Sequence, residues 1–253
     1  MKKIVSIAIF LSVLVQLGFA QVQGDKRFGF QLSPTFNWMS ADNNKINPSG
    51  TQIGLKLGML SEWYFSDNYA VTSGLGFSFN TGGTLLFEEA GRFWTQSDVP
   101  ENAYNNTEVG NAFAPQTKLK YSLQYVEIPI GLKMKMGEIA EKEFSYFLEP
   151  FLALGIRTQA RGTIEGGGDD AESINIREDV NLLNLSWGIG AGAEYGLNDQ
   201  TSLIAGLGVQ IGFADATDDD GGKIIETVMP LTESDEDSKG TINAIILKIG
   251  IMF

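Results

Sequence analysis

The sequence predicts an all-β protein, an eight-stranded antiparallel up-and-down transmembrane β-barrel. Three observations lead to this prediction. Eight segments alternate between apolar and small or polar residues with a period of two, which is the pattern of a strand with two different faces. Long connections alternate with tight ones along the chain. The 30 glycines and 11% aromatic residues favour strands and turns over helices.

The first twenty residues have the pattern of a secretory signal. Lys2 and Lys3 precede an apolar run over 4–17, and Gly18, Phe19 and Ala20 supply small residues where a signal peptidase cuts. The run is short for a membrane anchor. We therefore expect a signal peptide over 1–20 and one outer-membrane β-barrel domain over 21–253.

Each predicted strand has one apolar face. The strands lie near 28–38, 53–65, 69–79, 126–136, 144–156, 183–195, 203–213 and 245–253. Their other face carries Gly, Ser, Asn, Gln and isolated charges, which suits the crowded interior of a narrow barrel better than the wet face of a soluble sandwich. The apolar face is predicted to meet lipid, with aromatic residues such as Trp38, Trp63 and Tyr195 at its two borders.

The predicted connections differ in length. The links over 66–68, 137–143 and 197–200 are short, the link over 39–51 is medium, and those over 82–118, 160–179 and 215–239 are long. Barrels with long extracellular loops and short periplasmic turns have this order. Both ends of the chain are then expected in the periplasm of a Gram-negative bacterium.

Charged residues recur on the predicted inner face. Buried charges need partners, so we expect a mixed-charge network in the lumen. Its members are Arg27, Lys56, Glu62, Glu127, Lys133, Lys135, Glu149, Arg157, Glu194 and Lys248. An eight-stranded barrel is filled by its own side chains, which favours pairing over a conduction path. Pro129 lacks a ladder donor and is expected at a bulge or local distortion.

Two local patterns resemble a known family. The alternating Ile245, Leu247, Ile249, Ile251 and terminal Phe253 look like the signal by which barrel assembly machinery recognises outer-membrane proteins. The stretch Leu123-Gln-Tyr-Val-Glu-Ile-Pro-Ile-Gly-Leu-Lys133 resembles a strand of PorT-like outer-membrane β-barrel proteins. The resemblance implies an OmpX- or OmpA-like barrel. PorT itself is associated with type IX secretion, which is not thereby implied for every member.

Two loops are unusual. The segment 83–118 contains Leu85, Leu86, Phe87, Phe93, Trp94, Tyr104 and Phe113. Water-exposed loops seldom carry so many large apolar groups, so it either caps the barrel mouth or docks on a partner. Acidic clusters at 169–170, 218–220 and 235–237 favour solvated loops, with weak Ca²⁺ or Mg²⁺ binding shared with lipopolysaccharide as the alternative.

These features predict a non-enzymatic protein without cofactor, metal or catalytic residues. Histidine is absent and the net charge is −13, which argues against the commonest general base and against nucleic acid. The expected function is a structural or accessory subunit in outer-membrane lipid and lipopolysaccharide, with a protein partner bound through 83–118 and 215–239. A small channel for ions or solutes and a surface adhesin with cation-binding acidic loops are the alternatives.

Overall fold

The structure is a computed structural model that describes residues 25–104, 112–139, 144–166, 170–198, 200–226 and 232–253. The signal peptide predicted over 1–20 lies outside the described residues. Within the described ranges, no helix is long and apolar enough to cross a membrane.

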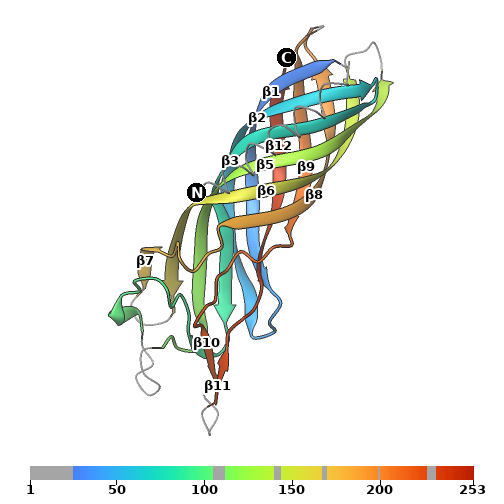
Figure 1. The fold of residues 1–253 in the computed structure, drawn as a ribbon. Helices are drawn as coiled ribbons and strands as arrows, with labels where there is room; N and C mark the ends of the chain where they lie inside the picture. The colour runs from blue at the N-terminus through green and yellow to red at the C-terminus, as the bar shows by residue number, and fades with distance from the viewer. Residues whose placement is uncertain (1–24, 105–111, 140–143, 167–169, 199, 227–231) are drawn as a thin grey trace, which may run out of the picture.

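Eight long strands form a closed ring (Figure 1). They are β1 (Lys26–Ala41), β2 (Ile46–Ser66), β3 (Tyr69–Phe87), β5 (Thr117–Ile139), β6 (Phe144–Glu165), β8 (Leu183–Gly196), β9 (Ser202–Gly212) and β12 (Gly240–Met252). Each pairs antiparallel with its sequence neighbours in the ring, and β1 pairs with β12 to close it. The predicted eight-stranded up-and-down barrel is confirmed.

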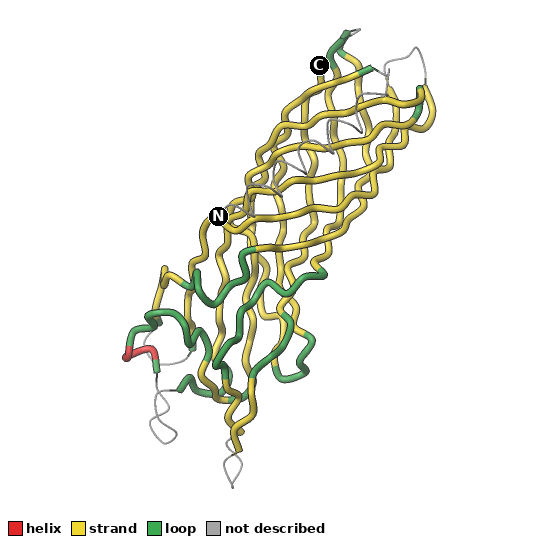
Figure 2. The backbone as a smooth tube through the Cα atoms, in the orientation of Figure 1, coloured by secondary structure: helices red, strands yellow, loops and turns green. Residues whose placement is uncertain are grey.

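The shorter elements gather at one end of the barrel (Figure 2). β7 (Ala171–Asn175) pairs with the far end of β6, and β4 (Ala90–Arg92), β10 (Lys223–Glu226) and β11 (Thr232–Asp235) form a separate three-stranded sheet. A 3₁₀ turn, η1, covers Glu101–Ala103. We call this end the head and define it as the described parts of 42–52, 80–125, 157–182 and 214–240. The opposite end carries the tight turns.

Several strands are longer than the sequence predicted. β3 continues to Phe87 and β5 begins at Thr117, so the connection spans 88–116 rather than 82–118. The predicted loop start at 160 is wrong, because β6 runs to Glu165. The predicted medium link over 39–51 is also wrong, because β1 and β2 leave only 42–45 between them.

The two faces of β5 exchange their chemistry part-way along the strand. Nearer the tight turns, the inward residues Glu127 and Lys133 are charged and the outward residues from Val126 to Met136 are apolar. In the head, the inward residues Leu119 and Leu123 are apolar and fully buried, and the outward residues are polar. A wall between water and a protein core is polar outside, whereas a wall in lipid is apolar outside. The exchange near Tyr125 therefore marks the border of the lipid region.

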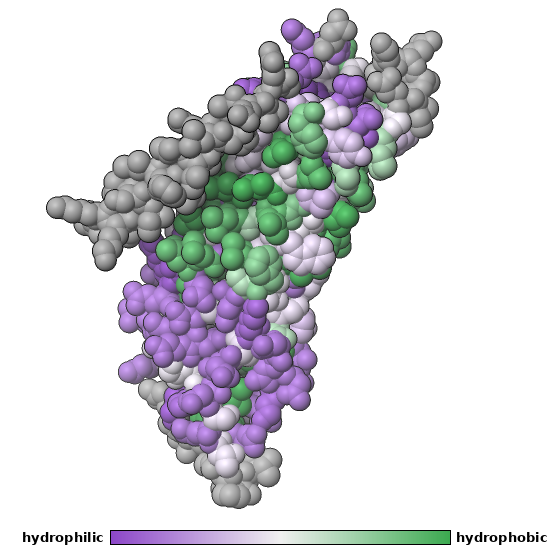
Figure 3. All heavy atoms as spheres, turned by 45° about the vertical axis from the view of Figure 1, so that its right-hand side comes forward, coloured by the Kyte–Doolittle hydropathy of each residue, from purple (hydrophilic) through white to green (hydrophobic). Residues whose placement is uncertain are grey.

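An apolar belt surrounds the barrel on the lipid side of that border. Its exposed members come from all eight strands and include Phe30, Ile53, Phe77, Ile130, Leu152, Trp187, Leu207 and Leu247. Figure 3 shows apolar residues gathered over the barrel and hydrophilic residues over the head. A water-soluble monomer does not expose a belt of this extent.

Three prolines interrupt the hydrogen-bond ladders of the wall. At Pro34, residues 32–34 of β1 lie opposite 247–249 of β12 without pairing, and the register is the same on both sides. Pairing is likewise absent opposite Pro129 between β3 and β5, and opposite Pro150 between β5 and β6. Proline has no N–H to donate, which explains each interruption. Pro129 thus lies at a local interruption, while the nearest bulge between β5 and β6 lies at Gln124 and Tyr125.

Candidate functional site

The lumen near the tight turns contains a cluster of ion pairs centred on Lys133. The Nζ atom of Lys133 donates to Glu62 at 2.6 Å and to Glu194 at 2.9 Å, and the residue is 1% exposed. These three residues come from β5, β2 and β8, so the cluster joins opposite walls of the barrel. Both carboxylates have further partners. Arg27 pairs with Glu194 and lies 3.6 Å from Glu62, and Lys135 lies 3.3 Å from Glu194. Hydroxyl groups also donate to them, that of Tyr64 to Glu62 and that of Ser202 to Glu194.

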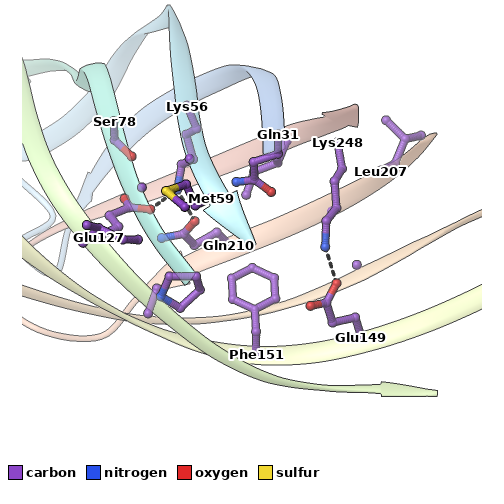
Figure 4. A pocket seen from close by; sticks show the side chains of 18 residues that line it. Gln31, Lys56, Met59, Ser78, Glu127, Glu149, Phe151, Leu207, Gln210 and Lys248 are labelled. Atoms are coloured by element: carbon purple, nitrogen blue, oxygen red, sulfur yellow. Dashed lines mark hydrogen bonds and ion pairs between the residues drawn. The ribbon is translucent and has the colours of Figure 1, made fainter. Parts of the chain in front are cut away.

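Two further ion pairs lie nearer the head (Figure 4). Lys248 pairs with Glu149, which also accepts a hydrogen bond of 2.7 Å from Thr72. Lys56 donates to Glu127 and to Gln210, both at 2.6 Å. The lumen carboxylates are therefore matched by cations from other strands, as a low-dielectric interior requires.

A cavity of about 80 Å³ lies between these two ion pairs. Gln31, Ser78 and Phe151 line it together with the paired residues (Figure 4). A Cβ added at Gly76 or Gly190 would be 3.5 Å or more from its neighbours, so packing does not demand glycine there. Because these glycines have no side chains, the space between the walls stays empty, and the ion pairs on either side separate it from the rest of the lumen.

Arg157 does not join this network. Its side chain turns inward, but its guanidinium donates to the backbone carbonyls of Arg177 and Val180. Within the described ranges, no carboxylate lies within 4.0 Å of it. The sequence prediction is corrected here, because the segment before β8 folds into the barrel mouth and offers carbonyl oxygens at the place where a carboxylate was expected. The other nine predicted residues lie in the ion pairs described above.

An apolar core fills the head above the charged lumen. Phe93, Trp94 and Phe113 are 4%, 4% and 0% exposed and pack on the inward faces of β3 and β5. The rings of Phe93 and Phe113 stack at 6.0 Å, and that of Trp94 meets Tyr121 edge-on at 5.3 Å. Of the two interpretations of segment 83–118, the structure thus supports a cap over the mouth. Leu86 is the exception, because it points outward from β3.

The family of the chain follows from its sequence as well as its form. Residues 19–218 match the family model described as the outer membrane protein beta-barrel domain. The chain belongs to this family. It is accordingly a protein of the Gram-negative outer membrane, and the head, which carries the long connections, is extracellular. The family model does not single out the PorT-like group, so that resemblance stays a prediction.

Solved barrels of similar form share little sequence with this outer-membrane barrel. Neisserial surface protein A, NspA, is 12% identical over 89% of this chain and 95% of its own, with a TM-score of 0.41. Ail of Yersinia pestis is 12% identical over 91% and 99%, with a TM-score of 0.36. OprG from Pseudomonas aeruginosa is 10% identical over 91% and 97%, with a TM-score of 0.39. No curated protein matches the chain. At these values the likeness carries no argument about function.

The predicted assembly signal lies on the outside of the last barrel strand. Ile245, Leu247, Ile249, Ile251 and Phe253 all point toward lipid from β12 or its end. Phe253 also exchanges two backbone hydrogen bonds with Phe28, of 2.7 and 3.1 Å, at the seam that closes the barrel.

Deletion of Phe253 is therefore expected to reduce the amount of folded barrel in the membrane severalfold, because it removes both the terminal aromatic residue and two seam hydrogen bonds. The measurement is the heat-dependent gel mobility of membrane fractions. Replacing Phe65, an exposed aromatic residue at the same end of the barrel but away from the seam, with Ala is the control. Wild-type levels of folded protein after the deletion would contradict the assembly-signal interpretation.

The acidic segment 215–239 folds against the cap. Its strand β10 pairs with β4, Gln96 donates to Asp218 at 3.2 Å, and Thr95 donates to the backbone carbonyl of Asp220 at 2.6 Å. Within the described part of the chain, no three acidic side chains are grouped to hold a metal ion. Burial and the neighbouring charge of Glu236 raise the pKa of Asp219 from an ordinary 3.8 to about 9.

This pKa shift predicts a pH dependence of the head. Between about pH 4 and pH 9, the folded head keeps a proton on Asp219 that the unfolded chain releases, so the stability of the head falls as the pH rises. Asp219→Asn is expected to remove that dependence and to protect the head at pH 8. The measurement is the ratio of limited-proteolysis rates of variant and wild type from pH 5 to pH 8. Asp237→Asn, at an exposed neighbour, should behave as wild type. A ratio for Asp219→Asn that stays constant with pH would count against the shifted pKa.

The sequence reasoning missed several members of the site. Tyr64, Thr72 and Ser202 donate to lumen carboxylates. All three occupy inward positions of the same alternation that identified the charges, so the period-two pattern was a sufficient signal for them.

Proposed function

We propose that this protein is a closed, non-enzymatic outer-membrane barrel that acts as a structural or accessory subunit and contacts a protein partner through its head. The observation that carries the proposal is the double blockage of the lumen. Ion pairs bridge the barrel at several levels, and an apolar core covers the mouth above them. A lumen of this kind supports anchoring rather than transport.

Catalysis in the lumen has little support from the geometry. Glu127 and Glu149, the two carboxylates beside the cavity, are each 7% exposed and each bound to a lysine. A general acid or base must reach its substrate, and these groups are sequestered.

Recordings on the purified protein in planar bilayers test the closed barrel. We expect no unit conductance at moderate voltage. Stable conductance steps would overturn the proposal in favour of the small channel. A porin of known conductance, recorded in the same bilayers, is the positive control.

Crosslinking tests the accessory role. A photoreactive residue at an exposed head position such as Ser234 should capture a specific envelope protein, and the same residue at Leu152 in the lipid belt should not. The PorT-like resemblance makes secretion components the first partners to look for. Calcium-dependent attachment to cells or matrix without such a partner would support the adhesin instead.

A further inference from the structure

The outer surface of the head has a strip without acidic residues just above the lipid belt. β3, β5 and β6 continue past the belt here, and their outward side chains on the strip are Thr84, Lys120, Ser122, Gln124, Thr158, Arg161 and Thr163. Thr84 pairs in register with Lys120, and Ser122 with Arg161, so these side chains are neighbours on one face. The chain has 31 acidic residues, which makes an acid-free basic strip a distinct feature of its surface.

Three bases elsewhere in the head have carboxylate partners, which the two bases of the strip lack. Lys45 pairs with Glu226, Arg92 with Glu233 at 3.5 Å, and Lys223 with Asp235. By contrast, no carboxylate among the described residues lies within 4.0 Å of Lys120 or Arg161. One N–H group of the Arg161 guanidinium donates a hydrogen bond of 3.1 Å to the backbone carbonyl of Ser173. The strip therefore presents positive charge that this molecule does not neutralise.

The distance of the strip from the lipid belt indicates which anions Lys120 and Arg161 can contact. On the same strands the lipid belt begins at Val126 and Ile156, so Ser122 and Arg161 are four and five residues beyond it. For a strand rise of about 3.3 Å per residue and a tilt of about 40°, this is roughly 10 Å above the acyl region. That level of an outer leaflet is occupied by the phosphates and sugars of lipopolysaccharide.

We propose that this strip binds the phosphorylated headgroup of a lipopolysaccharide molecule of the outer leaflet. Lys120 and Arg161 pair with its phosphates, for which a guanidinium fork and an ammonium group are suited donors. Gln124 lies on the belt side of Arg161, and its amide supplies hydrogen bonds to sugar hydroxyls. The hydroxyls of Ser122 and Thr158 donate to Gln52 and to the Gln124 carbonyl, so they remain to the sugars only as acceptors. The inference goes beyond the proposed function and does not depend on it.

Binding of lipopolysaccharide micelles to the purified protein tests the site. The test variant is Lys120→Ser with Arg161→Ser. The matched control is Lys45→Ser with Arg92→Ser, which removes the same charge from the head at ion-paired positions. Because each basic residue near an anionic surface adds to the attraction, the test variant should bind at least ten-fold more weakly. The control should remain within two-fold of wild type, and heat-dependent gel mobility verifies that each variant is folded.

Two further probes separate the headgroup from other anions. Lipopolysaccharide stripped of its phosphates should bind wild type as weakly as intact lipopolysaccharide binds the test variant. Inorganic phosphate should compete only at far higher concentration than the lipid. Equal binding by test variant and wild type, equal binding of the stripped lipid, or competition by inorganic phosphate at equal concentration would each overturn the proposal.

Discussion

Replacing Lys133 with methionine is expected to destabilise the barrel by about 3–5 kcal/mol, the cost of leaving buried charges without their partner. Lys133 holds Glu62 and Glu194 together, and the side chains of these carboxylates are only 4% and 6% exposed. Methionine fills a similar volume but provides no charge. Urea titrations of the protein refolded in lipid vesicles measure the free energy of unfolding.

Lys135 supplies the control for this variant. It contacts Glu194 at 3.3 Å, and its side chain is 20% exposed, so Lys135→Met should cost about 1 kcal/mol or less. Adding Glu62→Gln to Lys133→Met should recover part of the loss, because it removes one unpaired charge. Equal stabilities of the two single variants would contradict the central place of Lys133.

Replacing Phe113 with alanine is expected to open the cap while the barrel stays intact. Phe113 is 0% exposed and its ring lies between those of Phe93 and Tyr104, at 6.0 and 4.9 Å. Removing a buried phenyl ring costs about 3–5 kcal/mol. Limited proteolysis should then cut within 88–116 at least ten-fold faster, with the lipid-embedded fragment still protected.

Phe77 is the matched control for the cap. Its ring is 48% exposed on the lipid belt, so Phe77→Ala leaves no cavity in the head. The proteolysis pattern of this variant should be that of wild type. If Phe113→Ala also resisted the protease, the cap would not depend on its apolar core.

The barrel and its inner charges were predictable because a strand in lipid keeps one rule along its length. Outward residues are apolar and inward ones small or charged, so Glu62 and Lys133 could be placed by alternation alone. Arg157 obeyed the same rule, but its partners are backbone carbonyls of a loop. Every residue has a carbonyl, so no sequence pattern distinguishes such a partner.

The head escaped prediction because bulges conceal the exchange of faces. In β3 the apolar residues other than Leu86 stay at odd positions from Leu75 to Phe87, yet a register shift between Ser78 and Thr81 turns Leu85 and Phe87 inward. Apolar residues therefore appear to continue one face while they pass from the lipid side to the core side. In β3 the bulge and the border each shift the alternation by one residue and cancel, so a period-two analysis detects neither there.

The strands that carry the head also fix its orientation relative to the cell surface. β2, β3, β5 and β6 pass from the bilayer into the head as single strands of 19 to 23 residues, without an intervening linker. Swivelling about such a junction would break cross-strand hydrogen bonds on both sides of it. Whatever binds the outside of this protein is accordingly held at a constant angle and distance from the cell surface. A mechanical force on the bound partner is therefore transmitted directly to the barrel strands in the membrane.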